Sequence, residues 1–184
     1  MRKAMSVIMP AALLGAAMLV SGCSTLSRGP VGNTAVPPPA KVVDIARYQG
    51  LWYEIGRYEN GFEKGCEAVT ARYGPLPDGK IEVVNTCHKG AVDGPVSTAK
   101  GKAKVVDGSQ NAKLKVSFFG PFYGDYWVLD RAEDYSWAIV GEPSGRYLWI
   151  LSRTANLSEA DRNTLFTRAG ELGYDTALIR LVKH

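Results

Sequence analysis

Hydrophobic and polar residues alternate along several short stretches of the chain. Residues 112–119 place Leu114, Val116 and Phe118 on one side and lysine or serine on the other, while residues 98–106 alternate threonine or lysine with smaller residues. A period of two is typical of β-strands with one face in solvent. The pattern predicts eight strands, at residues 50–58, 68–73, 81–87, 98–106, 112–119, 126–130, 135–140 and 147–152. Residues 77–79, Pro-Asp-Gly, form the turn between the second and third strands.

The last three predicted strands lose this alternation. They contain the runs Tyr-Trp-Val-Leu, Trp-Ala-Ile-Val and Leu-Trp-Ile-Leu, which are apolar on both faces. Another element must therefore cover their outer side. We expect a helix, because Ser158 can cap its start with Asp161 in the capping-box position, and Gly173 can end it. Its apolar stripe consists of Leu165, Phe166, Ala169 and Leu172.

These elements predict an all-β fold, an eight-stranded antiparallel up-and-down β-barrel with a C-terminal α-helix packed outside. A ninth strand at residues 177–182 is expected to pair outside the closed barrel. Closure removes the edges that would otherwise aggregate, and a barrel of eight strands is just wide enough to hold one small apolar ligand.

The start of the chain has the parts of an export signal. Arg2 and Lys3 precede an apolar stretch at residues 7–20, as in a secretory signal peptide. Residues 20–23, Val-Ser-Gly-Cys, resemble the lipobox of bacterial lipoproteins, in which the thiol is acylated and becomes the mature N-terminus. A plain signal peptide and a transmembrane helix are the alternatives, but Pro10 interrupts an apolar stretch that is short for spanning a bilayer.

The lipobox resemblance implies three regions. Residues 1–22 are the lipoprotein signal peptide, and Cys23 carries acyl chains such as palmitate that hold the protein on the membrane. Residues 23–43 comprise this cysteine and a flexible tether rich in Ser, Gly and Pro, and residues 44–184 form the barrel domain. Ser24 looks like the outer-membrane sorting pattern, so we expect a lipid-anchored outer-membrane protein whose barrel faces the periplasm.

Charge and motifs limit the function classes. Removing the signal peptide lowers the formal net charge from +4 to +2, because Arg2 and Lys3 are lost, and this argues against a nucleic-acid partner. The chain contains no nucleophile elbow, zinc-protease motif, P-loop or dinucleotide fingerprint. Its only histidines are His88 and His184. We therefore predict no enzyme, no metal site and no cofactor, with a lipid hydrolase that uses carboxylates alone as the alternative.

Three motifs in order resemble the lipocalin family. Residues 50–55, Gly-Leu-Trp-Tyr-Glu-Ile, look like its G-x-W signature, and residues 148–153, Leu-Trp-Ile-Leu-Ser-Arg, look like its third signature region. Between them, residues 116–124 are similar to a run found in bacterial outer-membrane lipocalins. The resemblance implies structural roles for Gly50, Trp52 and Arg153, with the guanidinium of Arg153 stacked over the Trp52 ring at the closed end of the barrel.

One part of the chain departs from the family pattern. The second signature region usually carries an aspartate shortly before the tyrosine that opens the seventh strand, whereas this chain has Ala132 near that place and acids at slightly different positions before Tyr135. The turn between the sixth and seventh strands is therefore the part of the barrel that the family pattern predicts least well.

Cys66 and Cys87 flank the Pro-Asp-Gly turn at nearly symmetric distances. Because an exported chain meets an oxidising compartment, we expect a disulfide between adjacent strands. The alternative is a reactive thiol inside the barrel, as in the lipocalin-type prostaglandin synthases, although no histidine is evidently placed to activate either cysteine.

The inward faces of the predicted strands describe an apolar pocket with a few polar groups. Resemblance to the lipocalins implies that Tyr73, Asn85 and Trp149 line the binding site. Strand alternation adds Val69, Ala71, Val83, Leu114, Val116, Phe118 and Tyr147. For each aromatic residue, plain core packing is the competing interpretation. Lys100, Lys102 and Lys104 share one strand face and either meet a ligand head group or belong to a solvated barrel exterior.

Bacterial lipocalins are regarded as carriers of fatty acids or lysophospholipids. The resemblance therefore predicts a protein that carries or stores such a lipophilic ligand, with the tail inside the barrel and the head group at its mouth. A structural envelope lipoprotein that binds no ligand is the alternative, although small Ala71 and polar Asn85 favour an open barrel. The oligomeric state stays open between a monomer and a homodimer.

Overall fold

The computed structural model describes residues 30–184 of the 184-residue chain, so the predicted signal peptide and Cys23 lie outside the described residues. Its elements are α1 (Ile45–Tyr48), β1 (Gly50–Tyr58), β2 (Cys66–Pro75), β3 (Ile81–Lys89), β4 (Val96–Val105), β5 (Lys113–Phe119), β6 (Phe122–Arg131), β7 (Trp137–Gly141), β8 (Leu148–Ser152), α2 (Glu159–Glu171), η1 (Thr176–Leu178) and β9 (Ile179–Leu181). All nine predicted strands are present, most with ends shifted by a few residues. None of the helices within residues 30–184 is long and apolar enough to cross a bilayer.

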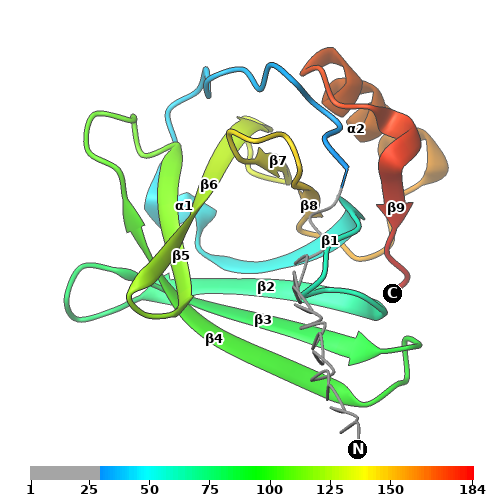
Figure 1. Cartoon of the computed structure of the whole chain (residues 1–184), viewed down its shortest axis with the longest axis horizontal. Coiled ribbons are helices and arrows are strands. Elements are labelled where there is room, and N and C mark those ends of the chain that lie inside the picture. Colours follow the sequence, from blue (N-terminus) through cyan, green and yellow to red (C-terminus); the bar gives the residue numbers. More distant parts are fainter. Residues whose placement is uncertain (1–29) are drawn as a thin grey trace, which may run out of the picture.

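The strands form the predicted antiparallel up-and-down barrel. Neighbours in sequence pair from β2 to β8, and β1 closes the ring by pairing with both β8 and β2. Figure 1 shows the ring of strands with α2 outside it. The β1–β2, β3–β4, β5–β6 and β7–β8 connections share one end of the barrel, which we call the mouth. The opposite end, next to α1, is the closed end.

The ninth strand joins β1 where β1 and β2 separate. β9 pairs with Gly56–Tyr58 of β1, whereas β1 pairs with β2 only from Gly50 to Tyr53. The Ala68 amide of β2 donates to the Lys183 carbonyl at 2.7 Å. The C-terminal segment thus bridges β1 and β2 at the mouth end, in addition to the eight strands of the ring.

An irregularity in β1 changes which side chains face the interior. Trp52 and Glu54 point inward, because they lie opposite the interior residues Ala71 and Leu151. The register then shifts between Glu54 and Gly56, so that Arg57, opposite Trp149, also points inward. A β-bulge of this kind re-aims the side chains that follow it.

The predicted helix covers the outer side of the late strands. Leu165 and Ala169 of α2 are buried against the outward-facing Ile139, Leu148 and Ile150. At its start, the Ser158 hydroxyl accepts a hydrogen bond from the Asp161 amide at 3.1 Å. The packing of α2 on these strands accounts for the apolar outer faces of β7 and β8.

Residues 30–43 differ from the flexible tether expected for this part of the chain. They lie along the outside of the ring, seen in blue before α1 in Figure 1. Asn33 is buried and donates to the Leu172 carbonyl at 2.9 Å, and Val43 is buried in the barrel core. Lys41 forms an ion pair with Asp130 at 3.0 Å. The Ser, Gly and Pro composition concealed these contacts because they use backbone groups and single side chains rather than a periodic apolar face.

A short helix that the sequence pattern missed closes the barrel. Asp44 caps α1, and the Trp52 indole donates to the Tyr48 carbonyl at the end of this helix at 2.8 Å. The Arg153 guanidinium carbon lies 3.7 Å from the centre of the Trp52 ring. The same guanidinium donates to the backbone carbonyls of Leu51, Arg47, Tyr48 and Gln49. The stacking contact expected from the two motifs is therefore present, and Arg153 also holds α1 in place.

The turn between β6 and β7, which departs from the family's sequence pattern, is ordered by local contacts. The Asp134 carboxylate accepts from the Ser136 amide at 2.9 Å, and Tyr135 is buried with a φ of 64°. The Tyr135 hydroxyl accepts from the Asp44 amide at 2.8 Å, which ties this turn to the start of α1.

Candidate functional site

A series of aromatic rings in contact with one another runs through the barrel from the closed end to the mouth. Neighbouring ring centres lie 5.1–6.4 Å apart from one member to the next. The series, which we call the aromatic column, consists of Trp52, Tyr48, Tyr73, Tyr126, Trp149, Tyr147 and Phe62. Phe62 ends the column at the rim, where its side chain is largely exposed. The column gives the interior an apolar, rigid wall.

Three tyrosines in this column are joined by hydrogen bonds between their hydroxyl groups. The Tyr126 hydroxyl lies 2.8 Å from that of Tyr48 and 2.9 Å from that of Tyr73. Burial raises the pKa of Tyr126, and the neighbouring Tyr48 and Tyr73 raise it further. The hydroxyls therefore stay neutral and satisfy one another in the closed half of the barrel.

A charged group lies inside the barrel on the mouth side of the tyrosines. Arg57 is fully buried and donates to the Glu54 carboxylate at 2.8 Å and to the Glu63 carbonyl at 2.9 Å. The Trp149 indole donates to the Glu63 carboxylate at 3.0 Å. Burial raises the pKa of Glu54 well above its usual value, the nearby Glu63 raises it further, and Arg57 opposes the shift. This end of the interior is thus polar and hydrogen-bonded.

Small side chains flank a polar residue at the middle of β3. Asn85 of β3 lies opposite Ala71 of β2 and Ala99 of β4. The Asn85 side-chain oxygen is buried and accepts no hydrogen bond from the described residues. It is therefore a polar group that a ligand could approach.

The structure brings most of the predicted ligand residues together. One interior cluster contains Tyr73, Ala71, Val83, Leu114, Val116, Phe118 and Trp149. Tyr147 precedes β8 and stacks on Trp149 with ring centres 5.6 Å apart. Val69 lies apart from this cluster and packs with Cys66, Cys87 and Val182, because a register shift between Glu67 and Thr70 interrupts β2.

The remaining predicted features lie outside the interior cluster. Lys100, Lys102 and Lys104 are exposed, and Ala103 between the last two is fully buried, so this lysine stripe faces outward as a solvated exterior does. Cys66 and Cys87 form the expected disulfide. Within residues 30–184, no three His, Cys, Asp or Glu side chains are grouped to hold a metal ion.

Sequence reasoning missed several interior residues. Glu54 shares the alternation of Trp52 and could have been assigned inward from that signal. Arg57 could not, because the β-bulge reverses the alternation before it. Phe62 and Glu63 lie in a connection with no strand pattern, and only the folded chain brings them to Trp149.

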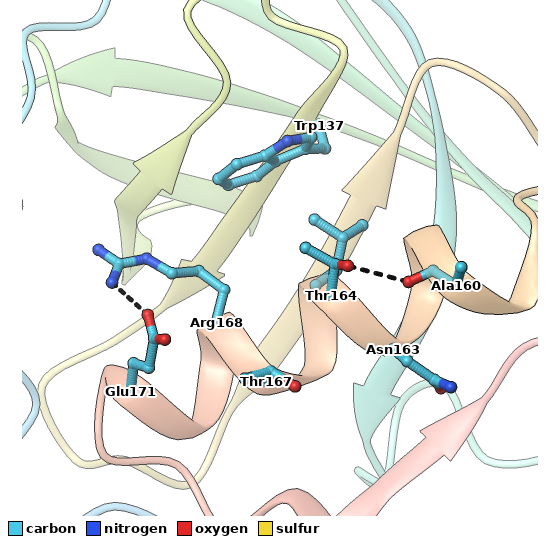
Figure 2. A pocket seen from close by; sticks show the side chains of 8 residues that line it. Trp137, Ala160, Asn163, Thr164, Thr167, Arg168 and Glu171 are labelled. Carbon is cyan, nitrogen blue, oxygen red and sulfur yellow. Dashed lines mark hydrogen bonds and ion pairs between the residues drawn. The ribbon is translucent and has the colours of Figure 1, made fainter.

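A surface groove of about 400 Å³ lies on the outer side of the barrel, between α2 and β7. Figure 2 shows the side chains of Thr164 and Arg168 rising from α2 toward Trp137. Arg168 is paired with Glu171 and with Asp130. None of the predicted ligand residues lines this groove, which is separate from the barrel interior.

Comparisons with known proteins agree with the motifs and the fold. The lipocalin-like domain family matches residues 43–184. The chain is 42% identical to outer membrane lipoprotein Blc of Vibrio cholerae over 156 residues, covering 84% of this chain and 90% of the relative. It is 40% identical to outer membrane lipoprotein Blc of Escherichia coli K12, covering 88% of each chain. It is also 40% identical to temperature-induced lipocalin-1 of Arabidopsis thaliana, covering 73% of this chain and 76% of the relative.

Solved structures share the fold at low sequence identity. Insecticyanin from the tobacco hornworm Manduca sexta aligns with a TM-score of 0.65 and 19% identity, covering 83% of this chain and 87% of that one. Lobster apocrustacyanin A1 aligns with a TM-score of 0.62 and 16% identity, covering 84% of this chain and 92% of that one.

Proposed function

This chain belongs to the lipocalin family, and we propose that it is an outer-membrane lipoprotein that binds a fatty acid or lysophospholipid in its barrel and carries or stores it. The aromatic column carries the proposal. Neighbouring rings from Trp52 to Phe62 offer a hydrocarbon tail an apolar surface that runs from the closed end to the rim. Lipocalins are generally binding or transport proteins, so we propose binding without catalysis.

The polar groups in the mouth half support a head group at that end. Glu54, Arg57 and Glu63 lie beyond the tyrosines, and Asn85 has a buried oxygen that accepts no hydrogen bond within residues 30–184. A hydroxyl or ammonium group of an amphiphile could donate to this oxygen. The tail would then extend from these groups along Trp149 toward Tyr126.

The anchor is the second part of the proposal. Acylation of Cys23 would hold the domain on the outer membrane, in agreement with the names of the bacterial relatives. Mass spectrometry of the protein purified from membranes tests this, because Cys23→Ala removes the only acceptor at the predicted cleavage site. An unmodified N-terminus in the unaltered protein would count against the anchor.

Titration of the delipidated protein with lysophospholipid and with fatty acid, followed by tryptophan fluorescence, tests ligand binding. We expect saturation near one ligand per barrel or per pair of barrels. Trp149→Ala should weaken binding by about tenfold, since it removes a large ring from the mouth half of the aromatic column. Trp137→Ala is the matched control, because Trp137 lies on the outer face beside α2. No binding by a folded barrel would favour the alternative, a structural lipoprotein without a ligand. The hydrogen-bonded tyrosines that fill the closed half agree with that alternative.

A further inference from the structure

Large apolar side chains are exposed at the mouth of the barrel. Phe119 and Phe122, on either side of the β5–β6 turn, are 82% and 77% exposed, and Phe62 in the β1–β2 connection is 63% exposed. Val92 and Val96, at the β3–β4 connection, are also exposed. Three separate connections thus place apolar tips at the same end. Aromatic side chains exposed together in this way mark an interaction surface.

The described chain also begins at this end. The Gly32 amide donates to the Gly145 carbonyl in the β7–β8 connection at 3.0 Å, and the Gly32 carbonyl accepts from the Asp175 amide at 2.8 Å. Gly145 has a φ of +64°, and a side chain there would meet the Asn33 carbonyl oxygen. These contacts fix residue 32 beside the mouth.

The distance from this point to the proposed anchor is short. Seven residue steps separate Cys23 from Pro30, and a fully extended chain of that length reaches at most about 25 Å. Because residues 30–43 pack on the barrel, they add no free length. An acylated Cys23 would therefore keep the mouth, rather than the closed end, close to the membrane.

The charges around the tips favour an apolar contact over an electrostatic one. Lys64 and Lys89 lie in or next to the connections at the mouth, but so do Glu59 and Asp93. A surface of mixed sign has no strong attraction for an anionic partner. Phenylalanine side chains, in contrast, gain by burial at the boundary between head groups and acyl chains.

We propose that the mouth docks on the phospholipid bilayer, with Phe62, Phe119 and Phe122 inserted at its interface. The proposal rests on the proposed anchor for its geometry and on the exposed tips for its chemistry. Docking in this orientation lets a lipid pass between the bilayer and the barrel without crossing water. With the tips inserted in the bilayer, this passage needs no soluble partner protein.

The test uses the acylated mature protein, residues 23–184, reconstituted in zwitterionic vesicles that contain spin-labelled lipids. A single cysteine carrying an environment-sensitive fluorophore is placed at Val92 or Phe122, and at Val42 or Leu51 as matched controls. The controls are also exposed apolar residues, but they lie next to α1 at the closed end. We expect quenching by the spin-labelled lipids at positions 92 and 122, and none at 42 and 51. Equal quenching at both ends, quenching at the closed end only, or none at all overturns the proposal.

A second variant tests the role of the tips themselves. With the fluorophore at position 92, Phe119→Ser combined with Phe122→Ser should lower the ratio of docked to undocked protein by about tenfold or more per phenylalanine. Val42→Ser combined with Leu51→Ser should leave it unchanged. A fluorophore response that depends on protein concentration and occurs without lipid quenching assigns the tips to a second copy of the chain and overturns bilayer docking. The readout needs no ligand, so a failed ligand titration does not affect it.

Discussion

Replacing Glu54 with leucine should destabilise the barrel strongly, because it leaves a buried arginine without its closest partner. Arg57 is fully buried, and its guanidinium stays charged in a protein. Leaving a buried guanidinium without its carboxyl acceptor typically costs about 3–5 kcal/mol, because the buried charge is then uncompensated. We expect about 3 kcal/mol here, the lower end, since Arg57 keeps its bonds to the Glu63 and Cys66 carbonyls. Glu54→Gln retains an oxygen acceptor for Arg57 and should cost less.

Urea unfolding followed by circular dichroism, with the disulfide intact, measures this loss. For a slope of about 2 kcal/mol per M, Glu54→Leu should lower the midpoint by about 1.5 M. Glu133→Leu is the matched control. Glu133 also pairs with an arginine and a lysine, but its side chain is 78% exposed, so its midpoint should not change measurably. A Glu54→Leu midpoint equal to that of the control would refute the view that the contact between Glu54 and Arg57 stabilises the barrel.

Three further predictions use the same unfolding measurement. Arg153→Ala should lower the free energy of unfolding by about 3 kcal/mol, since it loses the contact over Trp52 and the hydrogen bonds that hold α1. Arg153→Lys should recover only part of this loss. Full recovery by lysine would mean that the several guanidinium hydrogen bonds contribute nothing. Replacing Cys66 and Cys87 together by serine should lower the free energy of unfolding by about 3 kcal/mol, because the disulfide closes a loop of 21 residues and so restricts the unfolded chain. A double variant as stable as the parent would contradict this chain-entropy argument. Because the pKa of Glu54 is raised in the folded state, the folded protein retains a proton that the unfolded chain releases, so this residue should make stability decline as pH rises above about 4.5. Glu54→Gln should flatten the decline, and an unchanged pH profile would show that Glu54 is ionised in the fold.

Local sequence patterns predicted the barrel well because most strands obey simple alternation. The range at residues 50–58 matches β1, and Ser158 caps α2 as expected. The apolar outer faces of β7 and β8 required a cover, and α2 supplies it. Each of these predictions rests on a local requirement: an alternating strand buries one face, a helix start needs a cap, and an apolar outer face needs a cover.

The parts that could not be predicted depend on long-range contacts or on broken periodicity. Residues 30–43 have the composition of a tether, but Gly32, Asn33 and Lys41 dock on partners that are distant in sequence, in the β6–β8 region and at the end of α2. Val69 lies outside the interior cluster because the register of β2 shifts between Glu67 and Thr70, where Ala68 has a φ of 45°. The aromatic column was visible only in part, since Phe62 lies in a connection whose conformation no local pattern specifies.

The interior is graded in polarity along the barrel axis, and the bulge in β1 is the cause. Without the register shift after Glu54, Arg57 would point to the outer face, where α2 and β9 pack on their neighbours. The bulge instead places a fixed positive charge near Trp149, while the closed end contains Trp52 and neutral tyrosines. A fully apolar ligand gains nothing from this gradient, because it leaves the paired charges beside it in an environment of lower polarity. An amphiphile can place its tail along the aromatic column and keep its head group with the charges and the water at the mouth. The direction of the gradient therefore argues for a ligand with two chemically distinct ends, and we propose that its polar end faces the surface that carries Phe62.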